Sequence, residues 1–229
     1  GDGFKASGKE FFKPFKFRQK IFDEGLSKKP DFAISIGDHI YFDLRGENFP
    51  PVGRNSKLIK FFVGGYLKLL YGVFNRSERA DSENNESILK KIGNDQIASL
   101  YGTKFKSTPI YFIPDDHDYF ENDDAEEDLV TFPADDFSKG AFKKMADLFY
   151  PPLLDTPNNK PGRNTGRIRY GDAFEGLIAD CAGNMTLGDK KALLISNQDE
   201  KWLLSRIENS KAKHLAFIPS HPLGYTAGK

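Results

Sequence analysis

The sequence of 229 residues has a single cysteine and no surplus of charge of either sign. Because one thiol cannot form a disulfide within the chain, the fold cannot depend on one. The 33 basic and 33 acidic residues give a formal net charge of zero. Nucleic-acid binding usually requires a basic surplus or stripe, so the overall charge gives no reason to expect DNA or RNA as a partner.

Long apolar runs are also lacking. No stretch reaches the roughly 18 to 20 consecutive apolar residues of a membrane span, and residues 1–17 lack the apolar block of a signal peptide. Residues 57–74 are apolar around much of a helix, but three lysines and a Gly-Gly pair interrupt them. We therefore expect a packed or interface helix there and no transmembrane segment. The absence of a leader leaves two interpretations, a cytoplasmic protein or a mature chain.

Hydrophobic residues make up 38% of the chain, and single α/β domains of roughly 200 to 250 residues are common. Short apolar runs predict buried strands at 32–36, 110–113 and 214–221, and a hairpin at 167–180 that turns at Gly171 and Asp172. Helical periodicity predicts helices from Phe15 to near Ser27 and at 87–101, 137–150 and 197–212. This alternation predicts an α/β core, in which ligands gather beyond the carboxyl ends of strands.

Two packing predictions accompany this pattern. In the helix at 197–212, Trp202, Leu203 and Ile207 share one apolar face and are expected to point inward. Cys181 lies in the apolar sequence LIADCAG and is expected to be a buried structural thiol.

Three predicted strands end in groups that bind metals or transfer protons. Residues 37–43 (GDHIYFD) follow the first strand, 115–118 (DDHD) follow the second, and His221 ends the third. Oxygen and imidazole ligands of this kind suit iron, zinc, manganese or calcium. Asp38 and Tyr41 are three positions apart in a turn and can converge on one ion. The alternative is that Asp38 caps the segment that follows while Tyr41 packs in the core.

The acidic run at 115–118 is the more unusual feature, because its three carboxylates repel one another unless a cation or hydrogen bonds offset the charge. We interpret Asp116 and His117 as functional, with His117 suited to proton transfer near neutral pH. The acidic residues at 123–128 are expected to form a solvated loop.

The other histidines are assigned by position. His39 is expected to have a structural role beside the site, because successive side chains of an extended segment point to opposite faces. His214 begins a strand and is expected at the surface. His221 ends one, and metal ligation and a structural role are both open for it.

Four strings, GDHIYFD, DDHDYFEND, QDEKWLLSRIENSKAKH and PSHPLGYTAGK, together resemble the alkaline phosphatase D (PhoD-like) branch of the calcineurin-type metallophosphatases. The resemblance runs in the same order from about Phe15 to Lys229. It implies a four-layer α/β/β/α sandwich with a two-metal site at the strand ends. It also implies a phosphate ester substrate, a monoester or a diester, which is hydrolysed by a metal-bound hydroxide, and a periplasmic or secreted location.

The resemblance implies a role for each matching residue. Asp38 matches the carboxylate that bridges both metals, and Tyr41 matches a tyrosine that binds ferric iron as a phenolate. Asp116 is expected to bind the second ion, which would be calcium, zinc or manganese. His117 is expected to protonate the leaving group, and His221 matches a metal-binding histidine that follows a strand.

The sequence departs from this family pattern at both ends. An early strand with the first metal motif and a late Gly-Asp-x-His motif are both missing. One interpretation is that residues 1–229 form a single but incomplete metallophosphatase domain, a fragment of a larger enzyme, with a helical and polar insertion around 50–105. The alternative is a degenerate, non-catalytic binding or structural module. The substrate, the metal identities and the oligomeric state stay open.

Overall fold

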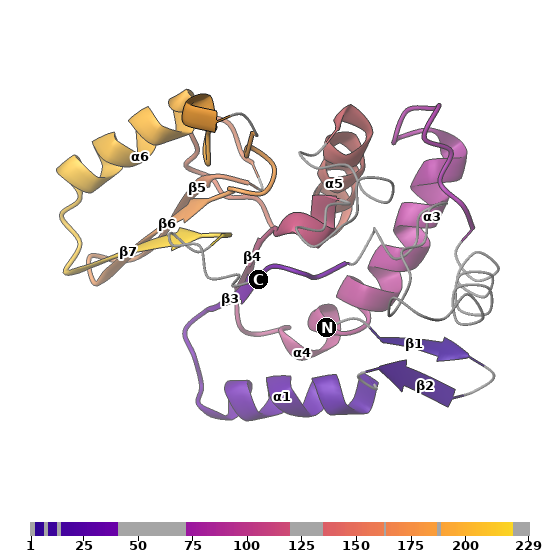
Figure 1. Cartoon of the computed structure of the whole chain (residues 1–229). Helices are drawn as coiled ribbons and strands as arrows, with labels where there is room; N and C mark the ends of the chain where they lie inside the picture. The colour runs from indigo at the N-terminus through magenta and orange to yellow at the C-terminus, as the bar shows by residue number, and fades with distance from the viewer. Residues whose placement is uncertain are drawn as a thin grey trace.

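The structure is a computed structural model, and it describes residues 3–6, 9–12, 15–40, 72–119, 135–162, 164–186 and 189–221. Within these ranges helices and strands alternate, so the predicted mixed α/β class is confirmed (Figure 1). Tyr41, the acidic residues 123–128 and most of the apolar segment 57–74 lie outside the described residues, as does part of the predicted insertion around 50–105.

The described strands form three sheets. The strands are β1 (Gly3–Ala6), β2 (Lys9–Phe12), β3 (Ala33–Ile36), β4 (Ile110–Ile113), β5 (Gly166–Tyr170), β6 (Phe174–Ala179) and β7 (His214–Pro219). β1 and β2 form an antiparallel pair by themselves. β3 pairs with β4 in parallel, and their carboxyl ends meet in the register Ile36 to Ile113. β6 lies between β5, which is antiparallel to it, and β7, which is parallel.

The helices are α1 (Phe15–Ser27), α3 (Glu83–Gly93), α4 (Tyr101–Lys104), α5 (Asp136–Phe149) and α6 (Asn197–Asn209), with shorter turns η2 (Asn94–Ala98), η3 (Asp116–Tyr119) and η4 (Asp189–Lys191). Ser82, Asp135 and Ser196 cap α3, α5 and α6, each accepting a hydrogen bond from the backbone N–H three residues later. The predicted start of a helix near Ser87 is wrong, because the cap at Ser82 begins α3 at Glu83.

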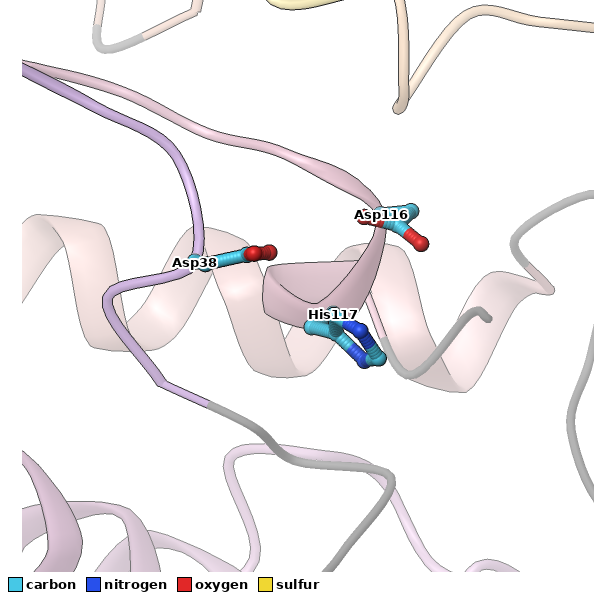
Figure 2. Close-up of side chains that lie close together, drawn as sticks. All are labelled: Asp38, Asp116 and His117. Carbon is cyan, nitrogen blue, oxygen red and sulfur yellow. The ribbon is translucent and has the colours of Figure 1, made fainter. Parts of the chain in front are cut away.

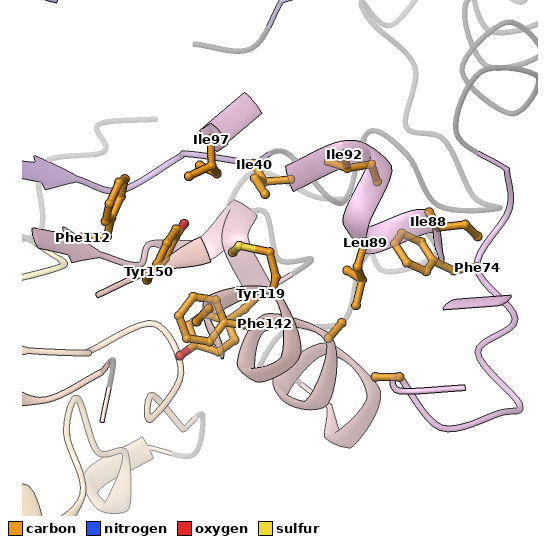
Figure 3. Close-up of a cluster of buried hydrophobic side chains, with 14 of the residues drawn as sticks. Ile40, Phe74, Ile88, Leu89, Ile92, Ile97, Phe112, Tyr119, Phe142 and Tyr150 are labelled. Carbon is orange, nitrogen blue, oxygen red and sulfur yellow. The ribbon is translucent and has the colours of Figure 1, made fainter. Parts of the chain in front are cut away.

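The β3–β4 sheet and the β5–β6–β7 sheet share one apolar cluster. Ile113 of β4 packs there with Ile168 of β5 and Ile178 of β6. Because strand side chains alternate between faces, the neighbouring Phe112 points the other way. It packs in a second cluster with residues of α3 and α5 (Figure 3). Phe112 also stacks on Tyr150, with ring centroids 4.3 Å apart.

The far face of the β5–β6–β7 sheet is covered by α6 (Figure 1). Leu203 is 3% exposed and packs with Leu177, Ala179 and Cys181, so the predicted burial of the thiol is confirmed. Burial of one leucine side chain contributes about 2 kcal/mol. The inward orientation predicted for Ile207 is wrong, because its side chain is 45% exposed.

Among the described residues, no helix combines the length and the apolar character that crossing a bilayer requires.

Candidate metal centre

The polar turns after β3 and β4 lie next to each other, because these parallel strands end at the same edge of their sheet. Asp38 lies in the first turn, and Asp116 and His117 lie in η3 after the second. One ligand atom from each of the three residues lies within 4.8 Å of the others. In Figure 2 the Asp38 carboxylate is directed toward the short helix that carries the other two side chains. The structure thus brings together three of the five predicted site residues.

The turn that presents Asp38 has an unusual backbone. Gly37 and Asp38 both adopt positive φ angles, 59° and 52°. The Gly37 N–H donates to the carbonyl oxygen of Ile113 over 2.8 Å, and a Cβ at this position would lie 2.5 Å from Cβ of Asp115. Only glycine fits there. The left-handed conformation of Asp38 costs about 1 kcal/mol, and strain of this kind accumulates at functional sites.

Electrostatics make this cluster unfavourable without a cation. Desolvation raises the pKa of the buried Asp116 carboxyl to about 6. His117 opposes that rise, while the negative charges of Asp115 and Asp38 add to it. Carboxylates that face one another without a cation repel. A cation between them would offset the repulsion and favour the charged form of Asp116.

Asp118 joins the two turns through hydrogen bonds. It is fully buried, and its two carboxylate oxygens accept the backbone N–H groups of Ile40 at 2.8 Å and Asp115 at 3.1 Å. Nδ1 of His39 lies 3.4 Å from Asp118 Oδ2, and Nε2 of His39 lies 2.8 Å from Ser35 Oγ. His39 therefore has the structural position that the sequence predicts for it. The role of Asp118 in joining the turns has no signal in the sequence that separates it from its acidic neighbours.

The remaining predicted residues have different outcomes. Nδ1 of His221 lies 2.9 Å from Oδ1 of Asp115, and His221 is not one of the three residues in the cluster. Tyr41, the predicted ligand of ferric iron, lies outside the described residues. His214 is exposed, as predicted.

The donor set fits a metal ion by its chemistry. Two carboxylates and one imidazole are ligands that zinc, manganese and iron accept, and calcium accepts the carboxylates. The three atoms lie within 4.8 Å of one another, so the group can hold one ion, with the imidazole either as its third ligand or beside it. Among the described residues no further group of three such side chains supplies a second ion.

No family model, curated protein or solved structure matches the chain.

Proposed function

We propose that this chain is a metal-dependent phosphoric ester hydrolase, in which Asp38 and Asp116 hold a cation and His117 transfers a proton to the leaving group. The observation that carries the proposal is the approach of these three side chains to within 4.8 Å of one another at adjoining strand ends. The short strings around them are also those that carry the resemblance to PhoD-like metallophosphatases.

We propose further that the fold is the four-layer α/β/β/α sandwich that the resemblance implies. The order of the apolar clusters supports it. Residues of α3 and α5 pack on one face of the β3–β4 sheet, the two sheets share a cluster, and α6 covers the far face of the second sheet.

A phosphate ester suits this centre because a cation held by Asp38 and Asp116 would attract its negatively charged phosphoryl oxygens. A bound cation lowers the pKa of a water molecule and offsets charge on the phosphoryl oxygens. Asp38 and Asp116 fix the position of that cation. His117 lies beside them and has the ring that donates a proton to a departing alkoxide, since its reference pKa is about 6.5. A ferric ion bound by Tyr41 stays a part of the proposal that rests on the resemblance alone.

The test is hydrolysis by the full 229-residue chain, loaded in turn with Mn²⁺, Zn²⁺, Fe³⁺ and Ca²⁺ and supplied with an alkyl phosphate monoester or a dialkyl phosphate diester, whose alkoxide leaving group needs a proton. Loss of a general acid reduces the rate about 10²- to 10⁴-fold, so His117→Ala should lower kcat by that factor while equilibrium dialysis still detects bound metal. The exposed His214→Ala is the matched control and should retain the activity of the wild type.

Three results would contradict the proposal. Equal kcat values for His117→Ala and His214→Ala would show that His117 does not donate the proton. Loss of the metal from His117→Ala would make His117 a ligand instead. Metal binding by the wild type without hydrolysis of either ester would favour the non-catalytic binding module.

A further inference from the structure

We propose that Asp115 is a positioning residue of the metal centre, which acts together with His221 to hold the turns that carry Asp38 and Asp116. The inference depends on the proposed function only for the identity of the centre. It concerns metal affinity, which is measured without substrate.

The side chain of Asp115 contacts three separate segments. Its Oδ1 accepts the backbone N–H of Asp116 at 3.0 Å and lies 2.9 Å from Nδ1 of His221. Its Cβ and carboxylate pack so closely on Gly37 that no Cβ is tolerated there. The residue therefore touches the turn after β3, the turn after β4 and the residue beyond the end of β7.

His221 is itself held firmly from the main chain. The N–H of the preceding Ser220 donates to the carbonyl oxygen of Ala179 over 3.0 Å. Ser220 Oγ accepts the N–H groups of Cys181 at 2.9 Å and Ala182 at 3.2 Å. The imidazole of His221 is therefore attached to a hydrogen-bonded backbone just after β7, and it contacts a carboxylate that follows β4. The contact ties the carboxyl ends of the two sheets together at the centre.

The Asp115 carboxylate holds the backbone of Asp116 and the imidazole of His221 through the same oxygen, Oδ1. Carboxylates that orient imidazoles or ligand turns beside a bound ion are a common outer support of metal sites, and their removal typically costs 10- to 100-fold in metal affinity. Asp115 has the contacts for this role.

The experiment measures Mn²⁺ affinity by electron paramagnetic resonance for Asp115→Ala, His221→Ala and the double variant. We expect each single variant to bind Mn²⁺ about 10- to 100-fold more weakly than wild type. The double variant should bind Mn²⁺ as well as the weaker-binding single variant, because both changes break the same contact between Asp115 and His221. Asp115→Asn should recover most of the affinity, since its amide oxygen still accepts from Asp116. Asp172→Ala, which removes a carboxylate that is 91% exposed, is the matched control.

Wild-type affinity in Asp115→Ala, or additive losses in the double variant, would overturn the inference. Failure of Asp115→Asn to recover affinity while its thermal unfolding matches the wild type would do the same. None of these measurements depends on hydrolysis. A protein that binds Mn²⁺ but hydrolyses no ester would therefore contradict the proposed function without contradicting this inference.

Discussion

Asp116 and Asp180 are both buried aspartates that follow a strand, and they differ in the groups that surround their carboxylates. Asp116 follows β4, and Asp180 follows β6 directly. Desolvation is the largest cause of a raised pKa for both carboxyls. Around Asp180 three hydrogen bonds oppose that rise and the charge of Asp199 adds to it, whereas around Asp116 the charges of Asp115 and Asp38 add to it and His117 opposes it.

The hydrogen bonds of Asp180 come from three donors. The Tyr119 hydroxyl donates at 2.5 Å, the Asn164 amide at 2.7 Å and the Gly183 N–H at 2.9 Å. A Cβ at Gly183 would lie within 2.7 Å of Tyr119 and Asp180, so only glycine lets the backbone N–H of this residue come so close to the carboxylate. The comparison teaches that burial alone does not identify a site. The carboxylate of Asp180 has three hydrogen-bond donors around it, and that of Asp116 has two other carboxylates beside it, so only the second is proposed to hold a cation.

The largest effect should come from breaking the Asp180 network. Asp180→Ala leaves the Tyr119, Asn164 and Gly183 donors without this acceptor, and since each unsatisfied buried donor costs about 1–3 kcal/mol, the total loss should be about 3 kcal/mol. Urea denaturation should show that decrease in the free energy of unfolding, and the exposed control Asp172→Ala should stay within about 0.5 kcal/mol of wild type. A loss below about 1 kcal/mol for Asp180→Ala would mean that the three donors find other acceptors.

Asp116→Asn should have the opposite profile. It removes a carboxylate from a repelling cluster, so the metal-free protein should be as stable as wild type or more stable. A ligand at 100 times its Kd stabilises a protein by about 2.7 kcal/mol. Wild type should gain this amount at that concentration of Mn²⁺, and Asp116→Asn should gain almost none. Equal gains in urea denaturation would show that the ion binds elsewhere and would end the contrast between the two aspartates.

The proximity of Asp38, Asp116 and His117 was predictable from the sequence, whereas the Asp180 network was not. Asp38, Asp116 and His117 follow short apolar runs, and the pairing of parallel strands brings such residues together. The contacts of Asp180 with Tyr119 and Asn164 join residues far apart in the chain that belong to no motif. The pairing of Asp115 with His221 is equally long-range. Helical periodicity identified the apolar face of α6 but not which of its residues would be buried, since Ile207 on that face is 45% exposed.

The most selective effect, and the smallest within any one pH unit, is the pH dependence of stability. The folded pKa of Asp180 is raised above its ordinary value of 3.8, so the folded state binds the proton more tightly than the unfolded chain. Its contribution to stability is fully present below pH 3.8 and is lost as the pH rises through the folded pKa. The free energy of unfolding of wild type should therefore fall relative to Asp180→Asn as the pH rises above about 4, by at most about 1.4 kcal/mol per pH unit for one proton.

Urea denaturation of both proteins between pH 3.5 and 7.5 measures the difference, from which the other titrating groups cancel. A difference that does not change with pH, or that grows in favour of wild type as the pH rises, would mean that the three donors outweigh desolvation and that Asp180 is an ordinary charged aspartate.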